Sequence, residues 1–194
     1  MNKFEKIKLL LHKKCENVSI EEGYEISKKL IEYLDNLPNT TIGLAANQIG
    51  INAAVCIIRV KTTPLVLINP IIIEQSGKFL YSEGCVSFKN EKCTTNRSST
   101  ILVKCDNYES LLYFDVSDLI ERLPQETNNS LDVLEIVAIQ HEIDHLNGIT
   151  MFDREIKKYN RNDKIIITKN NEEKFIKFKN LSQYENEGWI VKWI

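Results

Sequence analysis

The feature that most constrains this chain is a pair of histidines four residues apart, with a glutamate directly after the first. They lie in residues 140–148, which read QHEIDHLNG. Residues at this spacing on an α-helix project from one face, with Cβ atoms about 5–6 Å apart. Two imidazoles held that way can bind one metal ion at about 2.0–2.1 Å each. His141 and His145 therefore predict a metal site on a helix, with Glu142 beside it as a candidate general base.

The surrounding pattern predicts that this helix spans residues 131–146. Ser130 suits the N-cap, and Gly148 lies just past the end, where a C-terminal stop is expected. Three apolar residues precede the histidines on one stripe of the helix: Leu134, Val137 and Ala138. An unpaired polar ring on a buried stripe is costly, so metal binding is favoured over a chance pair of surface histidines.

A catalytic zinc-type site usually has three protein ligands and one open position. Downstream of His145 the chain has no further histidine and only the glutamates of its tail, so the third ligand is sought upstream. Cys85, in YSEGCVSF, follows a glycine after a predicted strand, and a thiolate with two imidazoles suits zinc or iron(II). Taken alone, a cysteine is more often a small buried hydrophobe, as we expect for Cys56 and Cys105.

The composition argues against several classes of partner. A formal net charge of −2 gives no bulk attraction to nucleic acid or to an anionic membrane. We expect no membrane span, because no apolar stretch is long enough, and no secretion signal, because the apolar run at residues 9–11 is too short. The five cysteines are odd in number and irregularly spaced, which favours reduced thiols in a cytoplasmic protein.

Helices and short strands are both predicted, so the expected fold class is α+β. Residues 19–37 have Ser19 and Glu22 at capping-box spacing, with apolar residues at every fourth position and Pro38 just beyond. Short β-branched runs separated by turn residues then predict antiparallel strands. These runs are residues 53–60, 65–68, 70–74, 100–105 and 111–116.

Beyond Arg154 the composition changes to a tail rich in Lys, Asn and Glu. We therefore predict two parts, a main domain at residues 1–157 and a strand-rich or mixed C-terminal extension at residues 158–194. Within the main domain, the polar residues 121–130, which read ERLPQETNNS, predict a surface loop.

Three segments, in this order, resemble peptide deformylase: TIGLAANQIG, EGCVSF and QHEIDHLNG. The stretch LVLINPIIIEQSG before the cysteine is also similar to that family, and the resemblance covers roughly residues 19–153. It implies antiparallel β-sheets packed around a central helix that carries the HExxH motif. It also implies a metal-dependent hydrolase that removes the formyl group from the N-terminal formylmethionine of nascent polypeptides and releases formate.

The resemblance implies a role for each residue of the site. Three residues bind one divalent metal ion, natively iron(II) and replaceable by zinc, nickel or cobalt: Cys85, His141 and His145. Glu142 acts as general acid and base, while Gln48 and the backbone N–H of Val86 stabilise the oxyanion. This assignment is chemically coherent, because a bound cation lowers the pKa of its water toward neutrality and a nearby carboxylate can move the proton.

Seven residues match positions that contact the substrate in the family: Ile42, Gly43, Tyr81, Gly84, Leu134, Val137 and Ala138. The two glycines are expected to let the substrate backbone approach closely. The other five would line the methionine pocket, although each could equally be plain core.

Glu83 and Arg97 match a buried family ion pair that supports the metal-binding loop. Breaking one partner of such a pair commonly costs about 3–5 kcal/mol. Arg97→Ala is therefore expected to loosen metal retention, and unchanged metal content after dialysis would count against this.

The chain departs from the family pattern near the site. Thr41 stands where the first glycine of the glycine-leucine-alanine motif is usual, and Val86 replaces a leucine. The usual proline after the cysteine motif is absent, with FKNEKC in its place, so contacts with residues beyond methionine are expected to differ. The segment between Cys85 and His141 is longer than usual, and we assign the excess to residues 123–130.

The tail departs further. Many bacterial members end in a long basic helix that docks on the ribosome, but such a helix is not evident here, so ribosome association is left open. The ending YENEGWIVKWI weakly resembles a C-terminal element of several bacteriophage proteins, which would suit a viral or otherwise atypical member.

Two alternatives stay open on the sequence. A metallopeptidase with the same helix motif would cleave internal peptide bonds, and the absence of a downstream ligand counts against it. A catalytically inactive metal-binding homologue would need neither Glu142 nor Gln48, and both are present. The expected partners are therefore the N-formylmethionyl ends of nascent chains.

Overall fold

The computed structural model describes residues 9–122, 130–156, 161–169, 172–185 and 187–191. The chain divides into two compact units, Met1–Ile156 and Lys157–Ile194. Most of the loop predicted at residues 121–130 lies outside the described residues. Its first two residues instead end a short helix, α3 (Ser117–Arg122), which the sequence pattern did not indicate.

The helix α2 (Ile20–Asp35) forms where its capping residues and apolar spacing predict it. The side chain of Ser19 accepts a hydrogen bond from the backbone N–H of Glu22 at 3.2 Å, which satisfies an N-terminal amide. Ile26, Leu30 and Leu34 are buried on one face, and the helix packs against β1, β2 and β3. α2 is thereby fixed beside the strand that leads into the site.

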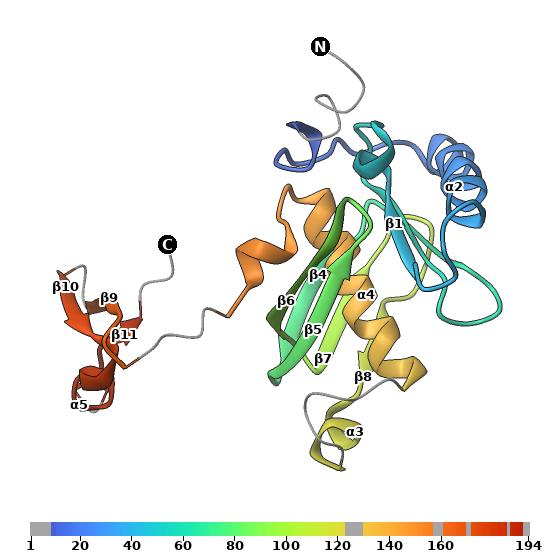
Figure 1. Ribbon diagram of the computed structural model, residues 1–194. Coiled ribbons are helices and arrows are strands. Elements are labelled where there is room, and N and C mark those ends of the chain that lie inside the picture. The colour runs from blue at the N-terminus through green and yellow to red at the C-terminus, as the bar shows by residue number, and fades with distance from the viewer. Residues whose placement is uncertain (1–8, 123–129, 157–160, 170–171, 186, 192–194) are drawn as a thin grey trace. The chain divides into compact units, whose positions relative to one another are not determined.

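Three small antiparallel sheets form the body of the first unit (Figure 1). One has the order β1-β2-β3, with bounds Gly43–Ala45, Val55–Ile58 and Leu65–Ile68. Another has the order β4-β7-β8, with bounds Ile71–Ser76, Thr100–Lys104 and Leu112–Asp115. The third is a hairpin of β5 (Phe79–Cys85) and β6 (Phe88–Arg97). All these pairings are antiparallel and accompany helices, so the α+β class is confirmed.

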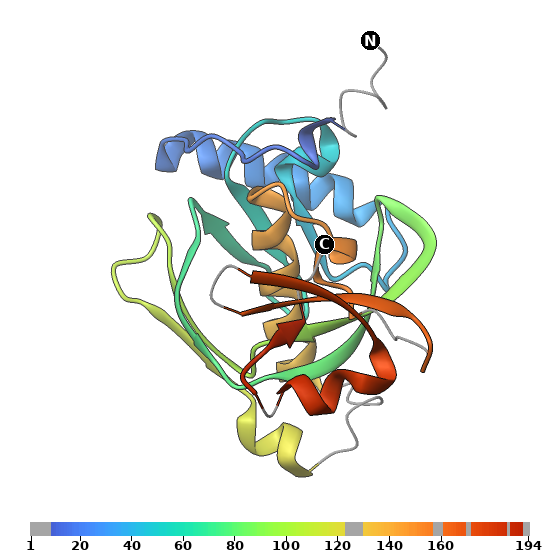
Figure 2. The ribbon, with the colours of Figure 1, turned by 90° about the vertical axis from the view of Figure 1, so that its left-hand side faces the viewer.

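The helix α4 (Leu131–Leu146) runs through the first unit with strands on either side (Figures 1 and 2). The side chain of Ser130 accepts a hydrogen bond from the backbone N–H of Val133. At the other end Gly148 has φ +74°, a conformation that suits glycine. α4 packs against β1 and β2, and its bounds are those predicted from the sequence.

α4 is buried on more than the one apolar face that the sequence pattern predicted. Thirteen of its sixteen residues are buried, including a run of polar ones: Gln140, His141, Glu142, Asp144 and His145. Leu134, expected on the buried stripe, is only partly buried. Because buried polar groups need hydrogen-bond partners, the C-terminal half of α4 is where a polar network is required.

Two hydrophobic clusters connect these layers. One joins α4 to the sheets through residues such as Ile136, Ile139, Cys56, Ile101 and Val103. The other joins α2 to β1 and β2 through residues such as Leu30, Leu34, Leu44 and Ile57. Short 3₁₀ helices follow β1 and α4, namely η1 (Ala46–Ile49) and η2 (Met151–Arg154). The side chains of the site are thus attached to packed elements.

The second unit has a small core of its own. Its sheet has the order β10-β9-β11, with bounds Glu172–Lys177, Lys164–Lys169 and Ile190–Val191, and it also contains η3 (Phe178–Asn180) and α5 (Leu181–Glu185). The buried residues are Ile165, Ile167, Ile176 and Trp189. The Lys174 ammonium lies 4.2 Å from the centroid of the Trp189 ring, a cation–π contact. In the described part of this unit, the longest helix is the five-residue α5.

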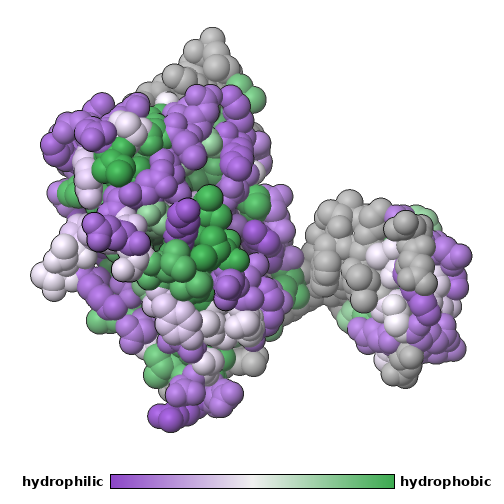
Figure 3. Space-filling model, turned by 180° about the vertical axis from the view of Figure 1, so that it is seen from behind, coloured by the Kyte–Doolittle hydropathy of each residue, from purple (hydrophilic) through white to green (hydrophobic). Residues whose placement is uncertain are grey.

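Figure 3 shows hydrophobic residues gathered on the back of the first unit, within a mainly hydrophilic surface. Large exposed hydrophobic side chains on β4, on β8 and just before β8 are Ile71, Ile73, Leu111 and Tyr113. Among the described residues, no helix has both the length and the apolar character needed to cross a membrane. All five cysteines are free thiols, as their irregular spacing favoured.

Candidate metal centre and substrate pocket

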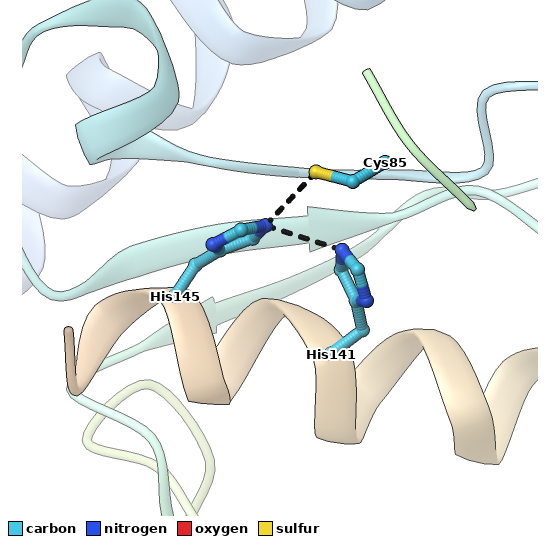
Figure 4. A group of neighbouring side chains, drawn as sticks. All are labelled: Cys85, His141 and His145. Atoms are coloured by element: carbon cyan, nitrogen blue, oxygen red, sulfur yellow. Dashed lines mark hydrogen bonds between the residues drawn. The ribbon is translucent and has the colours of Figure 1, made fainter. Parts of the chain in front are cut away.

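Cys85, His141 and His145 come together from elements that are far apart in the sequence. Cys85 is the last residue of β5, and both histidines lie on α4. The Cys85 Sγ atom lies 3.2 Å from His145 Nε2, which in turn lies 3.1 Å from His141 Nε2 (Figure 4). The three ligand atoms all lie within 4.8 Å of one another. The structure thus groups the three residues that the sequence singled out.

Two of the three ligand-atom separations in this group are close to those around a tetrahedral metal ion. With bonds of about 2.0–2.1 Å to nitrogen and about 2.3 Å to sulfur, tetrahedral angles separate the ligand atoms by about 3.3–3.6 Å. The observed separations of 3.1 and 3.2 Å are close to those values. Within the described residues, no fourth Cys, His, Asp or Glu belongs to the group. Its donor set of one thiol and two imidazoles is one that zinc or iron(II) accepts.

Glu83 orients one of the two histidines. Its Oε2 atom lies 2.7 Å from His141 Nδ1, so the Nδ1–H donates to the carboxylate and the Nε2 lone pair is directed to the ligand group. Arg97 donates to both oxygens of the same carboxylate, at 2.5 and 2.8 Å, and Thr95 Oγ1 also donates to it. Glu83 and Arg97 are 4% and 3% exposed. The predicted buried ion pair is therefore present, and it acts on a histidine of the site.

Asp144 extends this network and was missed at the sequence level. Its carboxylate accepts from Arg97 Nη1 at 2.5 Å on one side. On the other side it accepts two bonds from Arg154, at 2.8 and 3.1 Å. Asp144 lies within the HEIDH stretch itself, three residues after His141, and an acidic residue inside a buried helix requires a cationic partner. The position of Asp144 on a buried helix could therefore have predicted an arginine or lysine beside it.

Gln48 is held with its amide directed at the cysteine side of the site. Its Oε1 atom accepts from the backbone N–H of Ala45 at 2.7 Å, which fixes the carbonyl end. Its Nε2 atom donates to Ser87 Oγ at 3.1 Å and to Cys85 Sγ at 3.5 Å. Because an amide nitrogen only donates, Gln48 directs its N–H groups at the cysteine side of the site. Ser87 is a neighbour that sequence reasoning did not identify.

Glu142 is buried beside the ligand group with a free acceptor. It is 4% exposed, and its Oε2 atom has no hydrogen-bond partner among the described protein atoms. A Cβ atom built on Gly43 would lie 2.6 Å from Glu142 Oε1. The absence of a side chain on Gly43 therefore leaves room for Glu142. The expected role of Gly43 beside the substrate backbone stays a prediction.

Burial and neighbouring charges separate the pKa values of the site. Burial raises the pKa of Glu142 to about 7, although His141 opposes this. Burial also disfavours a charged His141, but hydrogen bonds with Cys85 and Glu83 outweigh it and raise its pKa to about 10. Burial and the charges of His141 and Arg97 lower the pKa of His145. Metal binding must then displace protons, because the ligands bind as thiolate and neutral imidazole.

A pocket of about 780 Å³ opens beside these residues. All seven predicted substrate residues line it: Ile42, Gly43, Tyr81, Gly84, Leu134, Val137 and Ala138. Gln48, Cys85, Val86, His141 and Glu142 line it as well. Val137 and Ala138 also belong to the hydrophobic core, with Ile42 and Tyr81 packed against it. These four residues are therefore both pocket wall and core.

Part of the pocket wall was not foreseen from the sequence. The segment between α2 and β1 contributes Leu37, Pro38, Thr40 and Thr41, and the β5-β6 hairpin contributes Ser82, Lys89, Asn90 and Lys92. A Cβ atom on Gly84 would meet Glu91 O at 3.7 Å and Lys92 Cγ at 3.8 Å, which is ordinary contact. Packing alone thus does not require glycine there, and its expected role in substrate approach stays a prediction.

Comparisons with known proteins agree with this geometry. The polypeptide deformylase family matches residues 5–162. A peptide deformylase of Syntrophomonas wolfei is 36% identical over 138 residues, covering 69% of this chain and 82% of that protein. Peptide deformylase 1 of Clostridium acetobutylicum is 33% identical over 151 residues, covering 75% and 87%. The peptide deformylase structure from Thermotoga maritima covers 76% of this chain and 92% of its own, with TM-score 0.56 and 28% identity.

The family match covers the segments that carry the ligand group and the described pocket wall. The family consists of metal-dependent hydrolases that act on formylmethionyl peptides, and the possible Cys/His/His metal site fits that chemistry. With fold, sequence and solved relatives in agreement, this chain belongs to the polypeptide deformylase family.

Proposed function

We propose that this chain is an active deformylase that hydrolyses the formyl amide at the N-terminal formylmethionine of nascent polypeptides, with Glu142 moving the proton. The observation that carries the proposal is the position of Glu142, buried beside Cys85, His141 and His145 with one carboxylate oxygen unpartnered. A structural metal site or an inactive binding protein has no need of such a base.

Cys85, His141 and His145 hold the divalent ion, which when bound supplies Lewis-acid activation of water. Glu83 and Arg97 keep the His141 ring in the orientation that ligation needs. The carboxylate of Glu142 takes a proton from the attacking water and returns it to the departing amine, which leaves as the new N-terminus. Formate is the other product.

Gln48 stabilises the oxyanion that forms on the formyl carbonyl. Its carbonyl end is held by Ala45, so the N–H groups are oriented before the substrate arrives. We assign the backbone N–H of Val86 as a second donor, because Val86 directly follows Cys85 and lines the same pocket.

The methionine side chain is assigned to the apolar part of the pocket. Its walls are Ile42, Tyr81, Leu134, Val137 and Ala138. Gly43 and Gly84 line the same pocket, and we assign both to the path of the substrate backbone. Gly43 also leaves space for Glu142. An unbranched apolar side chain fits such a wall without a polar partner.

We propose iron(II) as the native ion, with zinc, nickel or cobalt as replacements. Thiolate and imidazole ligands accept each of these ions, so availability decides which one is bound. An iron form with a thiolate ligand would be sensitive to oxidation, so anaerobic handling is required to test this choice.

We assign catalysis to residues 1–157 and treat residues 158–194 as an extension outside the site, because every residue of the pocket lies before residue 143. A cytoplasmic location suits five free thiols and a substrate made by the ribosome. Docking on the ribosome through a long basic helix is not part of the proposal, since the described tail forms three strands and a five-residue helix.

The test is purification under anaerobic conditions, followed by metal analysis and a formate-release assay on a formyl-Met peptide. We expect one ion per chain, stoichiometric formate, and no cleavage of the internal peptide bonds. Internal cleavage would indicate a peptidase, and binding of metal without formate release would indicate an inactive homologue.

A further inference from the structure

The first half of β6 brings two lysines to the pocket. Lys92 pairs with Gly84 in the hairpin register, one residue before the ligand Cys85. Cys85 pairs with Phe88, so residues 89–91 form an irregular step in the ladder, where Asn90 has φ +66°. Lys89, Asn90 and Lys92 all line the pocket. Both lysines are exposed, so they stand at its outer part.

These two lysines carry the uncompensated charge of the pocket wall. Neither forms an ion pair with a described residue. Among the described residues, the acidic ones that line the pocket are Glu83, held by Arg97 and His141, and the buried Glu142. Glu91 lies between the lysines in sequence but does not line the pocket.

The α2-β1 connection brings no negative charge to the pocket. Leu37, Pro38, Thr40 and Thr41 line the pocket from the α2-β1 connection, and none of them ionises. An acidic side chain placed at the outer part of the pocket would therefore meet two ammonium groups, without a competing exposed carboxylate from the described part of the wall. The field there favours negative charge in the bound peptide.

We propose that Lys89 and Lys92 make this enzyme prefer formylmethionyl chains that carry an acidic side chain among the residues that follow the methionine. This inference rests on the proposed function, because it takes the apolar wall as the methionine site. Once methionine occupies that wall, the following residues leave the pocket past its outer, lysine-bearing part. The preference acts on substrate capture, so it appears in kcat/KM.

A carboxylate could also come from the free C-terminus of a short test peptide. A nascent chain presents no free carboxyl end near its formylated start, so the side chain is the relevant group. Peptides with an amidated C-terminus separate the two sources. If the preference exists only for peptides with a free C-terminus, the proposal is wrong.

The experiment compares amidated formyl-Met-Ala-Xaa-Ala peptides in which Xaa is Asp, Asn or Lys, and a second series with Xaa directly after methionine. Exposed ion pairs are worth about 0.2–1 kcal/mol each, so two lysines predict an Asp/Asn ratio of kcat/KM of about 2- to 30-fold in at least one series. The ratio should shrink toward one as ionic strength rises from about 0.02 to about 0.5 M, where the Debye length shortens severalfold.

The variant Lys89→Glu/Lys92→Glu should lose the Asp preference and favour Lys instead. The matched control is Lys29→Glu/Lys104→Glu, which makes the same change in net charge at exposed positions outside the pocket. The control should keep the Asp preference, and an equal loss in both variants would attribute it to overall charge and overturn the proposal. An Asp/Asn ratio of one in both series of the parent enzyme would overturn it as well.

The Asn peptides allow failure of the lysine selectivity to be distinguished from failure of the proposed deformylase activity. Formate released from Asn peptides without any Asp preference supports the deformylase and rejects the lysine selectivity. No formate from any peptide by the metal-loaded enzyme rejects the deformylase itself, and the selectivity falls with it.

Discussion

Buried and exposed side chains of the β5-β6 hairpin have opposite physical character. Glu83 and Arg97 are 4% and 3% exposed and hydrogen-bond to each other and to α4. Lys89 and Lys92, in the first half of β6, are exposed and form no ion pair with a described residue. One hairpin thus carries both the buried support of a metal-binding histidine and two exposed lysines beside the pocket. We expect the buried pair to support the chemistry and the exposed lysines to favour one class of peptide.

The comparison predicts that changes to the buried polar side chains around the ligand group act on rate by orders of magnitude. Glu142→Gln keeps the shape of the side chain but cannot accept and return a proton. We expect kcat/KM to fall by about 100- to 10,000-fold, with one metal ion per chain retained. The measurement is formate release together with metal analysis of the same sample. Activity within about 3-fold of the parent would remove Glu142 from the mechanism.

The next largest effect is expected at Gln48. Gln48→Ala removes an oriented donor, which should lower kcat by about 100- to 1,000-fold and change KM little. Gln48→Glu serves as the companion variant, because it keeps size but places a second acceptor beside the oxyanion. Steady-state kinetics on a formyl-Met peptide measure both. A loss confined to KM in both variants would contradict the oxyanion role.

In the metal-free protein, ionisation of the buried Glu142 should lower the free energy of unfolding. Its folded pKa of about 7 lies above the ordinary value of 4.5, so the unfolded chain loses its proton first as pH rises. Below about pH 4.5 the carboxyl is neutral in both the folded and the unfolded chain, so the free energy of unfolding is unaffected by its ionisation. As pH rises from 4.5 toward 7 the unfolded chain ionises first, and the free energy of unfolding falls. Above pH 7, Glu142→Gln should be more stable than the parent by up to about 3 kcal/mol.

Urea unfolding of both metal-free proteins at pH 4.5 and pH 8 measures this difference. Glu32→Gln, exposed on α2, is the control for removing one carboxylate. Equal stability of Glu142→Gln and the parent at pH 8 would mean that Glu142 is not confined in its buried site.

The smallest expected effects come from comparing the two arginines that bind Asp144. Arg97 is buried and also holds Glu83, whereas Arg154 is 46% exposed at its side chain and binds only Asp144 among the bonds described. Arg97→Ala should weaken metal affinity by about 10- to 100-fold, since it frees the carboxylate that orients His141. Arg154→Ala should weaken it by less than about 3-fold, because exposed ion pairs contribute little.

Dialysis against a graded series of chelator concentrations, with metal analysis at each step, measures both variants. Thermal unfolding of the metal-free forms accompanies it, so that a folding defect is not mistaken for weak ligation. Equal metal affinity in Arg97→Ala and the parent would show that the buried pair does not support the site.

The sequence predicted those elements whose signals are local. α4 and β3 have the predicted bounds, and α2 begins after Ser19, because capping residues and apolar spacing act within a few residues. The strand β6 was missed, since its residues 89–92 are polar and its partner is fixed by the hairpin turn and by Arg97 reaching Glu83. Its formation depends on a contact across the sheet, which local pattern does not report.

For the site, motif spacing was enough to group Cys85 with the histidine pair, and the structure places their ligand atoms within 4.8 Å. The link from Asp144 to Arg154 and the space that Gly43 leaves for Glu142 were not foreseen. Both depend on which side chains of α4 meet residues of η2 and β1 in the folded chain. Spacing along one helix cannot specify such contacts.

The central claim is that Cys85, His141 and His145 bind a single ion whose remaining position is open to water. X-ray absorption spectroscopy at the metal edge of the anaerobically purified protein, combined with metal counting, tests this most directly. We predict one ion per chain, with one sulfur at about 2.3 Å, two imidazole nitrogens at about 2.0–2.1 Å and a light atom from solvent. A shell without sulfur, or one closed by a fourth protein side chain, would contradict the account.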